Sequence, residues 1–394
     1  MVTAVQPRPL APRPVRAPDA HRVPSLRHLG PNWYAAVMGT AIIASAGVAL
    51  PVDVPGLRAA CTGVWALSAA LLAVVLTARA AHWVHHRDQA RAHLLDPAVA
   101  PFYGCLSMAL SSVGAGTLTL GGDVVGPGAA TTAGFVLFAT GALLGLVIAV
   151  AVPYLMIARH RIAPGGASPV WLLPVVGPMV SASTGPLLVP RLPPGQWREA
   201  VLLASCTVFG LSLLATLLVL PVVFARLVHH GPLPLALTPS LFLVLGPLGQ
   251  STTAADKLAD AAPLALGPGY ASGFGVLAVV HGVPVMGFAL LWLVPAAAMV
   301  LRAARRGMPF TMGWWAFTFP VGTCVTGSAA LAERTGLVAY EWLAVALYAF
   351  LATAWAVAGT LTVRGLLRRE LLAAPRGGPR PAPRAPGRET ARTR

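Results

Sequence analysis

Long apolar runs alternate with short polar or basic breaks along most of the chain. A helix that crosses a bilayer needs about 20 consecutive, mainly apolar residues, and clusters of Gly, Pro and charged residues mark where each run ends. The pattern predicts an all-α polytopic membrane protein. Its ten transmembrane helices are expected near residues 32–51, 56–81, 101–121, 128–158, 169–190, 198–225, 234–255, 270–301, 309–331 and 338–363.

The predicted helices fall into pairs, because every second one ends in a similar step from apolar to basic residues. The step reads Thr77-Ala78-Arg79 after the second helix and Phe224-Ala225-Arg226 after the sixth. Comparable steps follow the fourth, eighth and tenth helices. A unit that recurs in this way indicates five tandem helical hairpins.

The two helices of each predicted hairpin differ in composition. Odd-numbered helices are rich in Gly, Ser and Thr, whereas even-numbered helices are rich in Leu, Val and Ala. This segregation predicts that the odd helices line a central pore and that the even helices face lipid. The alternative is that small residues only allow close packing between helices. The predicted pore-lining residues are Thr40, Ser107, Ser111, Gly114, Ser181, Thr184, Gly249, Gln250, Thr323 and Thr326.

Composition and charge agree with a membrane protein. The chain is 56% hydrophobic and 10% charged, which is too few charges to cover a soluble globule of this size. A net charge of +16 could indicate nucleic-acid binding, but most arginines follow even helices or lie in the two tails. The positive-inside rule then predicts that both termini lie in the cytoplasm. We therefore expect a plasma-membrane protein whose positive charge reflects its orientation and not a nucleic-acid partner.

Neither the two tails nor the cysteines indicate a catalytic or metal-binding site. We expect disordered basic cytoplasmic tails at 1–29 and 369–394, on either side of a transport domain at 30–368. The cysteines lie far apart inside apolar spans without a CxxC motif, so the sequence predicts no disulfide framework, no metal site and no cofactor.

The placement of ionisable residues favours anions as the transported solute. All acidic residues fall in tails, in loops or near the ends of predicted helices, whereas cation and proton carriers usually have a carboxylate within the membrane. Hydroxyl groups and a basic rim can stabilise anions without a buried countercharge. We therefore expect an anion channel or transporter with a neutral pore, and not an enzyme. The predicted cytoplasmic anion rim is Arg159, Arg161, Arg302 and Arg305.

His281 is the one histidine deep inside a predicted helix. It leaves open a proton site, and with it the alternative function of a proton-coupled C4-dicarboxylate carrier. A buried histidine with a satisfied hydrogen bond is the simpler interpretation. A redox enzyme with histidine-ligated cofactors would need paired histidines within the helices, which the sequence does not offer.

Four short motifs resemble one known family, the tellurite-resistance/dicarboxylate transporters. This family includes the bacterial tellurite-resistance protein, fungal malate and sulfite transporters and the plant guard-cell slow anion channel. The similarity extends over roughly residues 30–368. The motifs are Gly30-Pro31-Asn32-Trp33-Tyr34, Pro178-Met179-Val180-Ser181, Gly246-Pro247-Leu248-Gly249-Gln250 and Trp314-Trp315-Ala316-Phe317-Thr318-Phe319-Pro320.

The resemblance implies properties that the residues alone do not. It implies a homotrimer with one pore in each subunit, and a solute such as a C4-dicarboxylate, sulfite, a tellurite-type oxyanion or an inorganic anion. It also implies a phenylalanine gate in the ninth helix, which falls on Phe319 or Phe317. We expect Phe319, because it shares a helical face with Thr323 and Thr326, whereas Phe317 points about 200° away.

Overall fold

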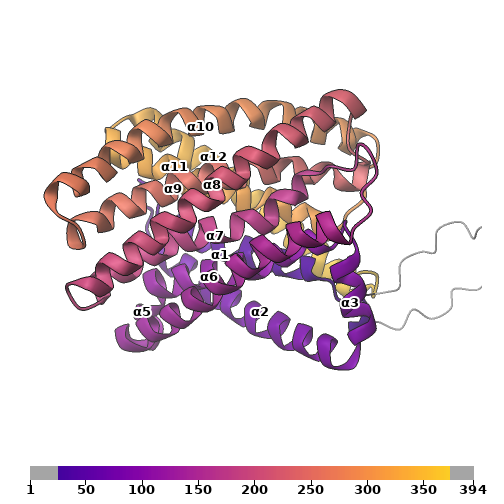
Figure 1. Cartoon of the computed structure of the whole chain (residues 1–394), viewed down its shortest axis with the longest axis horizontal. Helices are drawn as coiled ribbons and strands as arrows, with labels where there is room; N and C mark the ends of the chain where they lie inside the picture. The colour runs from indigo at the N-terminus through magenta and orange to yellow at the C-terminus, as the bar shows by residue number, and fades with distance from the viewer. Residues whose placement is uncertain (1–24, 373–394) are drawn as a thin grey trace, which may run out of the picture.

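The chain forms a bundle of helices that run in roughly the same direction (Figure 1). The computed structural model describes residues 25–372, which form helices joined by short turns. The short helix α3 (Arg87–Leu95) and both ends of the described chain lie at one end of the bundle, and α5 (Gly122–Val125) lies at the opposite end. These two ends are called the α3 end and the α5 end below.

Five helices form a closed inner ring, in which each contacts the next and the last contacts the first. Five longer helices cover this ring, and each packs against the inner helix that precedes it in the chain. The outer helix α12 also closes the ring, since the Trp355 indole N–H donates to the Thr40 hydroxyl on α1 at 3.1 Å. The inner helices are α1 (Tyr34–Val48), α4 (Gly104–Gly116), α7 (Leu173–Thr184), α9 (Leu245–Ala261) and α11 (Phe319–Thr335). The outer helices are α2 (Leu57–His85), α6 (Pro127–Ala158), α8 (Gln196–His230), α10 (Pro268–Arg305) and α12 (Val338–Leu367).

Burial separates the two sets of helices. Within the most apolar window of each segment, 83% of Ala100–Val125 and 94% of Pro169–Arg191 are buried, compared with 22% of Pro127–Ala158 and 28% of Gln196–His230. The all-α fold and the inner and outer positions that composition predicted are therefore confirmed.

Seven of the described helical segments are long and apolar enough to cross a membrane. The other predicted spans correspond to α1, α9 and α11, which have 15, 17 and 17 residues. These three helices are short because part of each predicted span is not α-helical. The count of ten transmembrane helices stays a prediction.

Each inner helix is preceded by a segment of 3₁₀-helix. Most of these segments carry a proline near their start, where its fixed φ and its missing N–H are tolerated. The same arrangement in all five hairpins agrees with an internal repeat. The segments are η2 (Pro31–Trp33), η3 (Ala100–Tyr103), η5 (Pro169–Leu172), η7 (Leu235–Val244) and η9 (Met312–Phe317).

At the α5 end, three of the inner helices continue into π-helical or 3₁₀ segments. A π-helical turn (Thr117–Gly121) joins α4 to α5, and 3₁₀ segments follow α7 (Gly185–Arg191) and α9 (Ala262–Leu264). Helix α11 ends at Gly336, whose φ of 69° lies in the left-handed region that glycine adopts without strain.

Parts of the two predicted tails belong to the folded domain. Leu26–His28 form a 3₁₀ turn (η1), and the Ser25 N–H donates to the Leu372 carbonyl at 3.2 Å. The two ends of the described chain are thus adjacent. The rest of the two predicted tails, residues 1–24 and 373–394, lies outside the described residues.

Candidate functional site

The inner ring encloses a cavity of about 610 Å³ in its α5 half. All five inner helices contribute to its wall, mainly through residues of their C-terminal halves. Among the hydroxyl and amide side chains of the wall, Gln250 donates to the Ser183 hydroxyl, and Thr253 and Thr326 share a hydrogen bond at 2.7 Å. Ser112 also lines the cavity, and its buried hydroxyl has no hydrogen-bond partner among residues 25–372.

Three of the predicted pore-lining residues lie in this wall, namely Thr184, Gln250 and Thr326. They come from three different inner helices, α7, α9 and α11. The Thr184 hydroxyl donates to the Val180 carbonyl at 2.9 Å, which leaves its oxygen able to accept a further hydrogen bond. The structure therefore brings these three side chains together around one space.

The other seven predicted pore-lining residues lie in contacts between helices. Ser111 and Ser181 hydrogen-bond to each other at 3.0 Å across α4 and α7, and the Thr323 hydroxyl contacts the Gly246 carbonyl of α9 at 3.2 Å. Thr40 accepts the hydrogen bond from Trp355 of α12. The close approaches at Ser107 (to Gly177), Gly114 (to α6) and Gly249 (to α11) are of the same kind.

A charged cluster occupies the outer part of the cavity wall. The carboxylate of Asp256 is 2.7 Å from the Arg334 guanidinium and 2.9 Å from the Lys257 ammonium, and Asp260 contacts both cations. The Asp256 side chain is only 3% exposed. Asp256, Lys257, Glu333 and Glu341 all line the cavity. The wall is therefore not neutral, which differs from the uncharged passage that the sequence suggested.

The sequence pattern ends the seventh predicted helix at residue 255 and so places Asp256 and Lys257 outside it. Helix α9 continues to Ala261, so Asp256 and Lys257 belong to the helix and not to a loop. Gln250, Thr253 and Lys257 follow each other at three- and four-residue spacing, which places them on one helical face. This spacing in the sequence indicates that Lys257 shares a helical face with Gln250 and Thr253.

Phe319 is the first residue of α11 and one of the largest fully buried side chains of the described chain. It lines the polar cavity and is 2% exposed. Toward the α3 end, the ring narrows to a second cavity of about 30 Å³, whose wall again comes from all five hairpins. That wall is almost wholly apolar, with Met38, Leu173 and Ala316 among its residues.

Phe317 lies in a different environment from Phe319. Its ring packs edge-on against Phe242, with the ring centroids 4.9 Å apart, and against Trp314 at 5.9 Å. Phe242 in turn stacks on Phe350 of the outer helix α12. The Phe317 ring is thus part of the packing between the inner segments and the outer ring.

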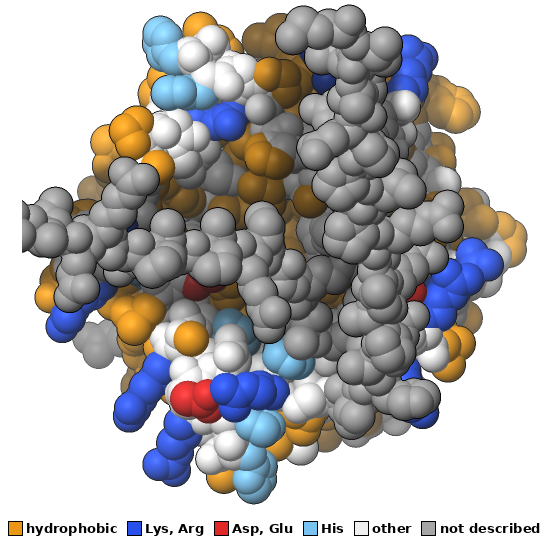
Figure 2. Space-filling model, turned by 90° about the vertical axis from the view of Figure 1, so that its right-hand side faces the viewer, with side chains coloured by type: hydrophobic (Ala, Val, Ile, Leu, Met, Phe, Trp, Pro, Cys, Tyr) orange, Lys and Arg blue, Asp and Glu red, His pale blue; other side chains and the backbone are white. Residues whose placement is uncertain are grey.

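The predicted rim arginines are at the α3 end but on the outer helices. Arg and His side chains are visible around that face of the molecule (Figure 2). Arg159, Arg161 and Arg305 are exposed at the ends of α6 and α10, and Arg302 borders a groove on the outside of the bundle.

The buried basic groups of the α3 end lie between α2, α3 and the N-terminal segment. The Arg79 guanidinium donates to the Tyr103 hydroxyl at 3.0 Å, and the rings of His82 and His93 stack with centroids 5.4 Å apart. Burial, followed by the charges of Arg79 and His82, lowers the pKa of His93 to about 4. Within residues 25–372, no group of three or more His, Cys, Asp or Glu side chains is arranged to hold a metal ion.

His281 lies outside the polar cavity. Its Nε2 is 3.1 Å from the Ser251 hydroxyl on α9, and its ring meets Phe209 of α8 edge-on at 5.5 Å. The side chain is therefore held between α8, α9 and α10.

Comparisons with known proteins give matches over most of the chain. The profile of the family described as voltage-dependent anion channel matches residues 28–363. An uncharacterized transporter of Methanocaldococcus jannaschii is 28% identical over 84% of this chain and 92% of its own length. A sulfite efflux pump of Arthroderma otae is 26% identical over 88% of this chain and 93% of its own length, and that of Trichophyton rubrum has the same identity and coverage.

Proposed function

Because the chain belongs to the voltage-dependent anion channel family, we propose that it moves a small anion across the membrane along the axis of its inner ring. The family match confirms the resemblance inferred from the motifs. The names of the family and of the relatives are those of a channel, transporters and pumps, which points to transport and not to catalysis.

One observation carries the proposal. The polar cavity lies on the axis of a closed ring, has side chains from every inner helix in its wall, and reaches a single buried phenylalanine, Phe319. On the α3 side of the ring lies the narrow, mostly apolar cavity. An ion that meets the Phe319 side chain loses hydration without gaining a ligand, so the phenyl ring acts as a gate.

An anion as the solute is supported mainly by the family and by the names of the relatives, because the wall itself carries three carboxylates (Asp256, Glu333 and Glu341) and one ammonium (Lys257). The Ser112 hydroxyl, which has no partner within residues 25–372, is a donor that an oxyanion can use. The Lys257 ammonium is already paired with Asp256 and Asp260. Two relatives are named sulfite efflux pumps, so sulfite is the first anion to test. His281 itself gives no support to a proton-coupled carrier, because it faces Ser251 and Phe209 instead of the cavity.

The test is an ion-substitution measurement on the purified full chain in planar bilayers. With Phe319→Ala to remove the ring, reversal potentials should follow the gradient of sulfite or chloride at fixed potassium. Reversal potentials that follow potassium would refute anion transport. A protein that is folded but carries no current with or without the ring would refute the axial pathway.

The proposal includes the orientation in a plasma membrane, with the α3 end in the cytoplasm. The arginines at the ends of α6, α10 and α12 support it through the positive-inside rule. Single cysteines introduced at Gln89 and at Asp53 in intact cells test it with a membrane-impermeant reagent. Labelling at Gln89 but not at Asp53 would overturn the orientation.

A further inference from the structure

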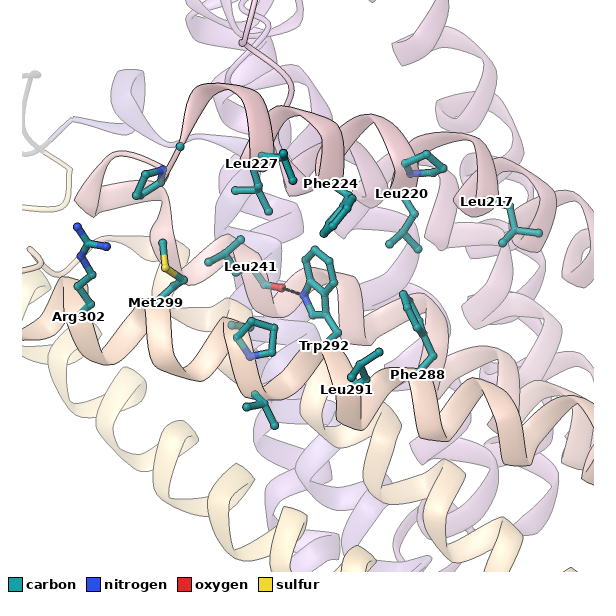
Figure 3. A pocket seen from close by; sticks show the side chains of 17 residues that line it. Leu217, Leu220, Phe224, Leu227, Leu241, Phe288, Leu291, Trp292, Met299 and Arg302 are labelled. Atoms are coloured by element: carbon teal, nitrogen blue, oxygen red, sulfur yellow. Dashed lines mark hydrogen bonds between the residues drawn. The ribbon is translucent and has the colours of Figure 1, made fainter.

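The outer helices α8 and α10 flank a groove of about 1000 Å³ on the outside of the bundle (Figure 3). The walls of the groove are exposed, with Phe224 at 58% and Leu291 at 67% of their maximal accessible area. Its floor is buried, since Trp292 is 8% and Leu241 2% exposed. Because Leu241 belongs to the inner segment η7, the groove reaches through the outer layer to the inner ring.

The groove is apolar along nearly its whole length. Leucine, valine, phenylalanine and proline side chains form most of its wall. The Trp292 indole N–H, which could otherwise require a polar partner, donates to the Leu241 carbonyl at 3.0 Å. The floor therefore has no unsatisfied donor there, and it suits a hydrocarbon chain.

One end of the groove carries a positive charge. Arg302 lies at the opposite end from Leu217 and Phe288, beside Met299 (Figure 3). This is the α3 end, where α8 and α10 both finish. Arg302 is exposed, and no carboxylate of residues 25–372 forms an ion pair with it.

We propose that this groove binds an anionic phospholipid, with an acyl chain along the apolar floor and the phosphate at Arg302. An elongated apolar groove that ends in a basic residue at the membrane surface matches the shape and charge of such a lipid. Basic pockets between transmembrane helices are sites of this kind.

Two other occupants fit less well. A second copy of this chain would have to bring a carboxylate to Arg302, because a charge that is covered without a partner is costly, and the chain has 12 acidic residues against 28 basic ones. The chain's own tails are rich in arginine and proline, so they would bring like charge to Arg302 and little apolar surface to the floor. The lipid satisfies both ends of the groove at once.

The experiment is native mass spectrometry of the detergent-purified full chain. Dioleoyl phosphatidylglycerol and dioleoyl phosphatidylcholine are added at equal concentration, so that the two lipids share their acyl chains and differ in net charge. The proteins compared are the unaltered chain, Arg302→Gln and Arg305→Gln. Arg305 is the matched control, because it is exposed at the same end of α10 but does not line the groove.

The unaltered chain should retain phosphatidylglycerol in preference to phosphatidylcholine. Arg302→Gln should reduce that preference about fivefold, because one basic residue near a headgroup contributes roughly 1 kcal/mol. Arg305→Gln should leave the preference unchanged. Equal retention of both lipids by the unaltered chain, or equal losses in the two variants, would overturn the proposal.

A second measurement addresses the competing occupant. Val294 lines the groove and is 70% exposed, so Val294→Cys places a thiol on its wall. If lipid fills the groove, oxidation in membranes should yield no more dimer than the unaltered chain yields. An efficient disulfide between two copies would show that protein covers the groove, and the lipid proposal would fail.

Discussion

The two halves of the inner ring are built from the same five hairpins but differ in width and in chemistry. The α5 half holds a cavity of about 610 Å³ with hydroxyl, amide and charged side chains in its wall. The α3 half leaves only about 30 Å³ between mostly apolar side chains, which is space for few water molecules. A hydrated ion can therefore occupy the first half but not the second.

Because of this difference, we expect the main barrier to ion flow along the proposed pathway to lie in the narrow α3 half. In the α3 half, Met38 of α1, Leu173 of α7 and Ala316 of η9 line the narrow cavity. Phe319, at the start of α11, lines the wide half. The one hydroxyl of the narrow wall, Ser240, already donates to the Leu237 carbonyl at 2.7 Å. The wide half thus admits a hydrated ion and the narrow half blocks it, so substitutions in the two halves should have different effects.

The largest effect is expected from Phe319→Ala. Removal of the ring joins the polar cavity to the narrow half and lets water reach it, so the barrier falls. We expect anion conductance to rise by about tenfold or more, since each 1.4 kcal/mol of barrier corresponds to a factor of ten. The measurement is single-channel or macroscopic current in planar bilayers.

Phe317→Ala is the control for this prediction. Its ring packs against Phe242 and Trp314, so its loss leaves a sealed gap that costs about 3 kcal/mol of stability. Conductance should not rise. If Phe317→Ala opens the pathway and Phe319→Ala does not, the assignment of the two faces is reversed.

The second effect concerns the charged cluster of the wide half. Asp256→Asn removes the buried carboxylate between Arg334 and Lys257, and breaking such a pair costs roughly 3 kcal/mol. Thermal unfolding of the purified protein should show the loss. Glu341→Gln removes the same charge from the same cavity without an ion pair among the described residues, and it should cost less than about 1 kcal/mol. Equal losses would mean that the ion pairs contribute nothing.

The sequence predicted the two rings better than the residues that face the axis. Odd and even helices differ in composition because one set is buried and the other faces lipid, and that difference needs no knowledge of neighbours. Small and hydroxyl residues, however, serve both for close packing and for lining a cavity. Ser111 contacts Ser181, whereas Ser112, one position further, faces the cavity. Only the rotation of each helix in the ring separates these two roles, and the sequence does not encode that rotation locally.

The third effect tests the packing role directly. At Gly249, an added Cβ would lie 2.5 Å from the backbone of Cys324 on α11. Gly249→Ala should therefore push α9 away from α11 and cost about 1–3 kcal/mol. Gly246→Ala is the control one turn earlier, where the nearest atom would be 3.9 Å away in the Pro320 side chain. It should be neutral or slightly stabilising, because alanine favours the helix. Thermal unfolding separates the two variants, and similar behaviour would contradict the close approach.

The smallest effect compares one added hydroxyl group in each half of the ring. Ala316 lines the narrow half and Ala330 the wide half, and both are buried, at 7% and 6% exposure. Each alanine is replaced by serine in the Phe319→Ala protein. The hydroxyl of Ala316→Ser gives a dehydrated ion a ligand where the wall offers almost none. One such hydrogen bond contributes about 1 kcal/mol, so the current should rise about fivefold.

The same oxygen at position 330 joins a wall that already holds several hydroxyls, so the current should change by less than about twofold. With Phe319 intact, neither serine should matter, because the ring controls the barrier in series. If Ala330→Ser raises the current as much as Ala316→Ser does, then hydration is limiting along the whole axis. The two halves would in that case not differ in the way that their walls suggest.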